Sequence, residues 1–149
     1  MILDKTDKKI IKELQASGRE SASYIADKIK VSTPTVTERI RKLIDSGVIV
    51  GFQVILNPTK VGLDISAIIT VISGSSNNYK EVTNKAKTTP EVVQCFSTTG
   101  IGSHKLIVTT KNSSSLEELL RKIQKWPGVI RTETQIILSS YKKGSVIPI

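Results

Sequence analysis

Nine polar side chains within residues 30–42 are of the types that contact nucleic acid. They are Lys30, Ser32, Thr33, Thr35, Thr37, Glu38, Arg39, Arg41 and Lys42. Short hydroxyl side chains can approach base edges and thymine methyl groups in the major groove, and arginine or lysine can reach guanine or phosphate. Serine and threonine are also common where a helix begins, because their hydroxyls cap its first amides. A capped helix with a solvated face is therefore the alternative interpretation.

A single helix over this stretch would present four of these side chains on its outward face and a fifth on the flank of that face. Its apolar stripe consists of Val36, Ile40, Leu43 and Ile44. With a step of 100° per residue, the outward face comprises Thr35, Glu38, Arg41, Lys42 and Asp45, with Arg39 on its flank. Ser32 or Thr33 is expected to cap the helix, which tolerates Pro34 in its first turn and ends at Gly47.

Two shorter amphipathic helices are expected before it. Asp4 is a suitable cap for the first, which stops at Gly18, and Ser21 is a suitable cap for the second. Only residues 30–32 separate the second helix from the third, and so short a connection makes the helices cross steeply, as in a helix-turn-helix. This context favours DNA binding over the alternative of a merely solvated helix.

The composition narrows the function classes. The net charge of +9 suits an acidic partner such as DNA, but residues 51–149 hold 12 Lys and Arg against 6 Asp and Glu, so basic charge is not confined to the third helix. One histidine and one cysteine are too few for a zinc cluster. No nucleophile–base pair or complete phosphate-binding loop is evident, so no enzyme activity, cofactor or metal is predicted.

Location and redox chemistry also follow from the composition. No apolar run approaches the length of a membrane span, and the N-terminus lacks the pattern of a secretory signal, so a cytoplasmic location is expected. Cys95 lies in an apolar alternation, which predicts a buried and unreactive thiol.

Residues 48–64 are predicted to form a junction. Apolar residues alternate at Phe52, Val54 and Leu56 before the turn signal Asn57-Pro58, which indicates a short strand followed by a turn. An isolated strand leaves its backbone groups unpaired, so it is expected to pair with another subunit.

The remaining residues alternate between strand and helix patterns. Strands are predicted at 65–74, 91–100, 103–111 and 128–138, and helices at 77–90 and 113–127. This βαββαβ order predicts a ferredoxin-like domain, in which an antiparallel sheet carries both helices on one face. Its bare face would favour pairing of two subunits. The expected α+β plan is a helix-turn-helix (winged-helix-like) domain at 1–50, a strand and linker at 51–64, and a ferredoxin-like oligomerisation domain at 65–149.

In this order and spacing, six segments resemble the Lrp/AsnC (feast/famine) family of transcriptional regulators over essentially the whole chain. They are LDKTDKKIIKELQASGRES, IADKIKVS, VTERIRKLIDSGVIVGF, NPTKVGL, PEVVQCFSTTG and PGVIRTETQIIL. The resemblance implies a sequence-specific regulator, commonly of its own gene, that dimerises through the second domain and often assembles into tetramers or octamers. An architectural DNA-binding protein without an effector, or a ferredoxin-like metabolite-binding enzyme, are the alternatives.

The resemblance also implies that the domain at 65–149 senses a ligand, with amino acids frequently bound between dimers, beside the loop that joins its second and third strands. The candidate effector contacts are Thr98, Thr99, Gly100, Gly102, Ser103 and His104. Ser103 stands where the family usually has aspartate, so an amino acid's ammonium group loses a charged partner, although backbone amides near Gly100 and Gly102 could still hold a carboxylate. Ordinary amino acids are therefore expected to bind weakly or not at all, and His104 is expected at the loop edge.

Lys30 is a second departure from the family, which commonly has glycine at this turn. A left-handed conformation there would cost on the order of 1 kcal/mol.

Overall fold

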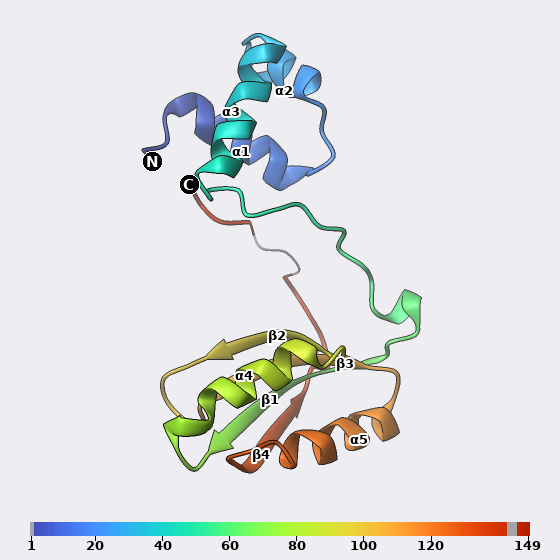
Figure 1. The fold of residues 1–149 in the computed structure, drawn as a ribbon. Helices are drawn as coiled ribbons and strands as arrows, with labels where there is room; N and C mark the ends of the chain where they lie inside the picture. The colour runs from blue at the N-terminus through green and yellow to red at the C-terminus, as the bar shows by residue number, and fades with distance from the viewer. Residues whose placement is uncertain (1, 143–145) are drawn as a thin grey trace. The chain divides into compact units, whose positions relative to one another are not determined.

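The computed structural model describes residues 2–142 and 146–149. The chain divides into two compact units: Met1–Ile55 together with Lys142–Ile149, and Leu56–Tyr141. Figure 1 shows a helical first unit and a second unit in which helices cover a sheet.

The first unit contains α1 (Lys5–Ala16), α2 (Ala22–Ile29) and α3 (Thr33–Asp45). The three helices begin where capping residues occur: Asp4, Ser21 and Ser32 each accept a hydrogen bond from an amide in the first turn. Their apolar stripes meet in one core, in which Ile10, Ile25, Val36 and Leu43 are fully buried, but Ile44, which the sequence assigns to the apolar stripe of α3, is 46% exposed. The predicted helix-turn-helix is confirmed.

The turn between α2 and α3 has the expected strained residue. Lys30 adopts the left-handed conformation, with φ of 61° and ψ of 52°, and the amide of Val31 donates to the carbonyl of Ala26 at 3.0 Å. This closes α2 in a single residue, which leaves Ser32 free to begin α3 in a new direction.

The strand predicted near Phe52 is not formed in this chain. Residues 51–57 are all described and have no strand hydrogen bonding, and a short 3-10 helix (Thr59–Val61) follows. The apolar side chains of this segment stay exposed, with Val54 at 84% and Ile55 at 75%. A strand requires a neighbouring strand, and none lies beside this segment within the described chain. Its pairing with another subunit stays a prediction.

The last residues of the chain belong to the first unit, whereas the sequence-based plan places everything after residue 64 in the second domain. The Gln15 side chain holds the backbone of Ile147 at both polar groups: Oε1 accepts from the amide at 2.6 Å, and Nε2 donates to the carbonyl at 3.1 Å. Ile149 packs against the core of the three helices.

The second unit is an antiparallel sheet with the strand order β2-β3-β1-β4. Its elements are β1 (Ile65–Ser73), a 3-10 helix (Ser76–Asn78), α4 (Tyr79–Thr88), β2 (Val92–Ser97), β3 (His104–Thr110), α5 (Ser113–Gln124) and β4 (Val129–Ile136). Both helices cover the same face of the sheet (Figure 1). The predicted ferredoxin-like fold is confirmed.

The core of this unit lies between the sheet and the two helices. Ala67, Ile69 and Val71 of β1 alternate toward the helices, and Trp126 after α5 is only 5% exposed. The opposite face pairs Ile68 with Ile107 across β1 and β3. Dimerisation through that face stays a prediction. Among the described residues, no helix is long and apolar enough to cross a membrane.

Candidate nucleic-acid interface

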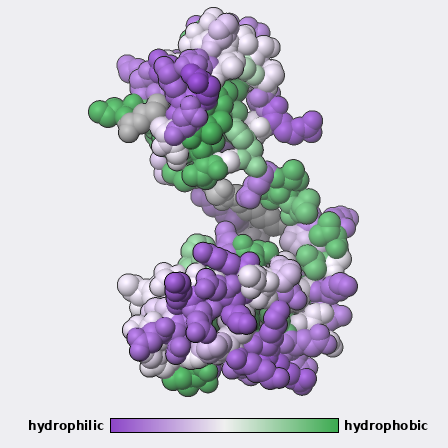
Figure 2. Space-filling view, in the orientation of Figure 1, coloured by the Kyte–Doolittle hydropathy of each residue, from purple (hydrophilic) through white to green (hydrophobic). Residues whose placement is uncertain are grey.

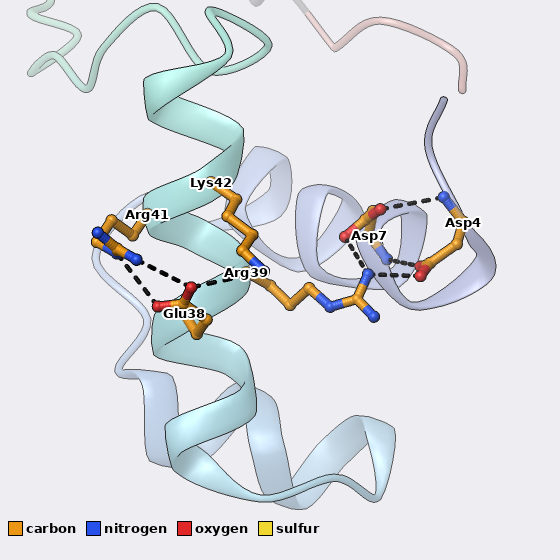
Figure 3. A network of polar contacts seen from close by, with 6 residues as sticks. All are labelled: Asp4, Asp7, Glu38, Arg39, Arg41 and Lys42. Atoms are coloured by element: carbon orange, nitrogen blue, oxygen red, sulfur yellow. Dashed lines mark hydrogen bonds and ion pairs between the residues drawn. The ribbon is translucent and has the colours of Figure 1, made fainter. Parts of the chain in front are cut away.

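On the outward face of α3, Arg41 and Lys42 both contact the carboxylate of Glu38 (Figure 3). The Glu38 carboxylate accepts from Arg41 Nε at 3.1 Å and Nη2 at 2.9 Å, and Lys42 Nζ lies 3.6 Å away. The hydrogen bonds from Arg41 hold the pKa of Glu38 below its usual value. Arg41 and Lys42 remain 65% and 60% exposed, so this group presents one net positive charge to solvent.

The hydroxyl groups at the start of α3 cap the helix. Ser32 Oγ accepts from the Thr35 amide at 3.2 Å and lies 2.7 Å from Thr35 Oγ1, while Thr37 Oγ1 donates to the Thr33 carbonyl at 3.1 Å. Within the described part of the chain, the Thr33 hydroxyl has no such partner. Thr33 and Thr37 are both exposed. Capping therefore explains Ser32 and Thr35, whereas Thr33 and Thr37 stay accessible at the surface.

Arg39 has a structural role that the sequence does not reveal. Its guanidinium donates to the carboxylates of Asp4 and Asp7, the two residues that form the capping box at the start of α1 (Figure 3). The bond to Asp7 is 3.0 Å long, and Asp7 is 1% exposed. The hydrogen bond to Asp4 makes the largest contribution to raising the pKa of Arg39, and the hydrogen bond to Asp7 makes the next largest. The side chain thus fastens α3 to α1, and its contact with DNA stays a prediction.

Sequence inspection could have found half of this arrangement. Asp4 and Asp7 have the spacing of a capping box, in which each side chain accepts from the other residue's amide. The cation that both carboxylates share is Arg39 of α3, 32 residues after Asp7. Only the packing of the three helices brings it to the start of α1.

The six candidate effector contacts lie in the loop that joins β2 and β3 and at the first residue of β3, and they are divided between solvent and core. Thr99 and Gly100 are exposed, but Ser103 is 5% exposed and His104 is 2% exposed. Thr98 Oγ1 is buried without a hydrogen-bond partner in the described structure. Only the outer half of the loop faces solvent, so it alone is open to a ligand.

Gly102 marks the point where the loop turns inward. Its φ is 83°, and a Cβ added there would lie 2.5 Å from Thr70 Cγ2 and 2.9 Å from the Val71 carbonyl oxygen. The Ser103 hydroxyl that follows lies 3.3 Å from the Val71 carbonyl, 2.9 Å from Ser73 Oγ and 2.8 Å from His104 Nδ1. Ser103 is therefore occupied by internal partners.

His104 is the first residue of β3, so it lies at the loop edge as expected, but its side chain is buried. Its Nε2 lies 3.4 Å from Thr83 Oγ1, and its ring meets the Tyr79 ring edge-on with 5.2 Å between centroids. Burial lowers the pKa of His104 below its usual value. Alternation along β3 points this side chain to the helical face, away from solvent.

An exposed helix bearing basic and hydroxyl groups, set by a short turn against a second helix, defines a DNA-binding helix-turn-helix protein. Residues 3–50 match the model of winged helix-turn-helix DNA-binding domains, and residues 66–147 match the model of the Lrp/AsnC ligand binding domain. The chain belongs to the Lrp/AsnC family of transcriptional regulators.

Individual relatives span nearly the same length. The HTH-type transcriptional regulator FL11 of Pyrococcus horikoshii is 37% identical over 147 residues, which cover 99% of this chain and 97% of the relative. The structure of Escherichia coli AsnC has a TM-score of 0.91 at 27% identity, covering 99% and 100% of the two chains. A Neisseria meningitidis regulator in complex with L-Met has a TM-score of 0.93 at 25% identity, covering 99% and 97%.

Proposed function

We propose that this protein regulates transcription in the cytoplasm by binding duplex DNA through α3, without a catalytic step. The observation that carries the proposal is the exposed surface of α3, on which Thr33 and Thr37 are accessible near the start of the helix and Arg41 and Lys42 are accessible further along it. Hydroxyls suit base edges, while the longer cations reach guanine or phosphate. Lys30 is exposed in the turn, which supports a contact between its ammonium group and a DNA phosphate.

Glu38 is a partner of Arg41 that DNA can replace. An exposed ion pair contributes little stability, because water and salt screen it. A DNA phosphate or guanine edge can therefore replace Glu38 as the partner of Arg41 at small cost. The carboxylate meanwhile keeps the guanidinium plane oriented in the unbound protein.

A two-fold dimer is the proposed binding form. Two recognition helices must reach successive major-groove faces, roughly 34 Å apart, so the expected operator is a near-palindrome. Sedimentation should give a dimer or a multiple of one, including the tetramer or octamer implied by the family.

We also propose that a small molecule modulates this regulator, without assigning which molecule it is. The second unit matches a ligand-binding domain, and one relative of the same fold was solved with L-Met. In this chain Ser103 supplies no negative charge and is buried, so we expect calorimetric titration with the common amino acids to give no micromolar binding. Micromolar binding of any of them would show that this loop does not limit amino-acid affinity.

The test of DNA binding compares two double variants that remove the same charge from the same unit. Arg41→Ala with Lys42→Ala changes the α3 face, and Lys8→Ala with Lys9→Ala changes exposed positions of α1. Fluorescence anisotropy with DNA from upstream of the protein's own gene should show weaker binding for the α3 variant. The slope of log affinity against log salt should fall by about 0.9 for each phosphate that the variant no longer neutralises. Equally weakened binding in both variants would move the interface away from α3.

A further inference from the structure

A groove on the helical layer of the second unit is lined mainly by basic side chains. It has a volume of about 610 Å³, and its lining residues are Lys85, Glu118, Arg121, Lys122, Lys125, Trp126 and Pro127. We propose that this groove binds the sugar–phosphate backbone of duplex DNA, as a second contact surface in addition to α3. The inference rests on the proposed DNA-binding function.

The charge balance of the groove favours a polyanion. Four cations face one carboxylate, Glu118. Among the residues that the structure describes, the amines of Lys85, Lys122 and Lys125 form no ion pair. Arg121 pairs with Glu117 at 2.6 Å, but both side chains are largely exposed, at 70% and 65%. Figure 2 shows hydrophilic side chains over much of the visible surface of this unit.

The groove is poorly suited to a compact anion. Arg121 and Lys122 lie in the last turn of α5 and Lys85 in the last turn of α4. Carbonyl groups and the negative end of the dipole are found at that end of a helix, so the backbone offers no cluster of amide donors for a single phosphate. Long, separate lysine side chains instead suit several phosphates along a strand, where affinity comes largely from counterion release.

Duplex DNA fits better than a single strand. Single-stranded sites present aromatic rings on which bases stack. The only aromatic ring of this groove belongs to Trp126, which is 5% exposed and packs in the core. The groove therefore offers charge without a stacking platform, which is the chemistry of backbone contact.

Basic residues at helix C-termini also have a purely structural explanation, since they interact favourably with each helix dipole. That effect acts on α4 and α5 separately. It predicts no change in DNA affinity when Lys122 and Lys125 lose their charge, so DNA binding separates the two explanations.

The experiment uses the full chain and two charge-matched variants. Lys122→Gln with Lys125→Gln neutralises the groove, and Lys60→Gln with Lys80→Gln neutralises two exposed lysines of the same unit that do not line it. Anisotropy with a labelled duplex of arbitrary sequence, about 40 base pairs long and so able to span several helical turns, is measured over a salt series. Fluorescence of Trp126, the only tryptophan, checks that each variant is folded.

The groove variant should lower the slope of log affinity against log salt by about 0.9 for each of the two lysines, and the control should leave it unchanged. A slope equal to that of the wild type would overturn the proposal. An unchanged slope is also the result expected if the groove binds an acidic protein instead of DNA. Equal slopes for both variants below the wild type would overturn it too, because overall charge would then suffice. Arg41→Ala with Lys42→Ala in the same assay distinguishes failure of α3 binding from failure of the groove.

Discussion

The face of α3 and the loop between β2 and β3 both carry polar side chains that the sequence marks as candidate contacts, but the two regions differ in how many of these side chains are exposed. On α3, Arg41 and Lys42 are more than half exposed. In the loop, Ser103 and His104 follow two glycines, yet both side chains are buried. A helix fixes side-chain direction by its period, so the apolar stripe identifies the outward face. In a loop, the backbone conformation and the neighbouring strand decide direction.

The largest effect is expected at Gly102, where the loop turns inward. In Gly102→Ala the added methyl group would clash with Thr70 and the Val71 carbonyl, and alanine would also be strained in the left-handed conformation. We therefore expect a decrease of roughly 2–4 kcal/mol in unfolding free energy. Gly100→Ala is the matched control, with φ of 88° but open space, and should cost only about 1 kcal/mol. Guanidinium unfolding followed by Trp126 fluorescence measures both. Equal decreases would mean that the inner loop is not tightly packed.

Asp7→Ala should have the next largest effect, in the first unit. It removes a buried carboxylate that accepts from the Asp4 amide and from Arg39, so a decrease of roughly 1–3 kcal/mol in unfolding free energy is expected. Hydrogen exchange of the α1 amides should accelerate, and Arg39→Ala should change it in the same direction. Arg41→Ala, on the exposed face, should leave α1 exchange unaltered. Unchanged exchange in Asp7→Ala would contradict the structural role given to Arg39.

Glu38→Gln tests the proposed DNA-binding face of α3. Removing this carboxylate frees Arg41 and Lys42 and removes a negative charge that faces DNA, so affinity should rise by roughly two- to fivefold at low salt. The gain should shrink as salt increases. Glu133→Gln, which removes an exposed carboxylate from β4, is the control. A decrease in affinity would mean that Glu38 itself contacts a base.

The smallest effect concerns pH. Because burial lowers the pKa of His104 in the folded state, the unfolded chain binds the proton more tightly. The contribution of His104 to stability is complete above the unfolded pKa, near 6.5, and is lost as the pH falls below it. Unfolding followed by Trp126 fluorescence should give lower stability at about pH 5.5 than at about pH 7.5, on either side of that value. His104→Phe should reduce this dependence; an equal dependence in the variant would assign it to other groups.

Much of the fold follows from local sequence signals. Asp4, Ser21 and Ser32 mark the helix starts, and Lys30 adopts the left-handed turn that the family comparison suggests. The alternation of strands and helices predicts the second unit because each pattern extends over most of an element. These features depend on residues that lie close together in the chain.

The features that sequence reasoning missed depend on distant partners. The segment near Phe52 has the pattern of a strand, but pairing needs a neighbour that the pattern does not specify. Arg39 appears on the flank of an exposed helix until α1 is packed beside it. His104 follows a glycine-rich loop, and only the register of β3 places it in the core.

The contact between Gln15 and Ile147 bears on the order in which the protein is made. Residues of α1 leave the ribosome before the second unit, and Ile147 leaves after every element of that unit. The three helices can therefore assemble early around their own core, but the hydrogen bonds to Ile147 and the packing of Ile149 are added only after the second unit has been synthesised. The nascent helical unit thus lacks the contacts of Ile147 and Ile149 until the second unit has been translated.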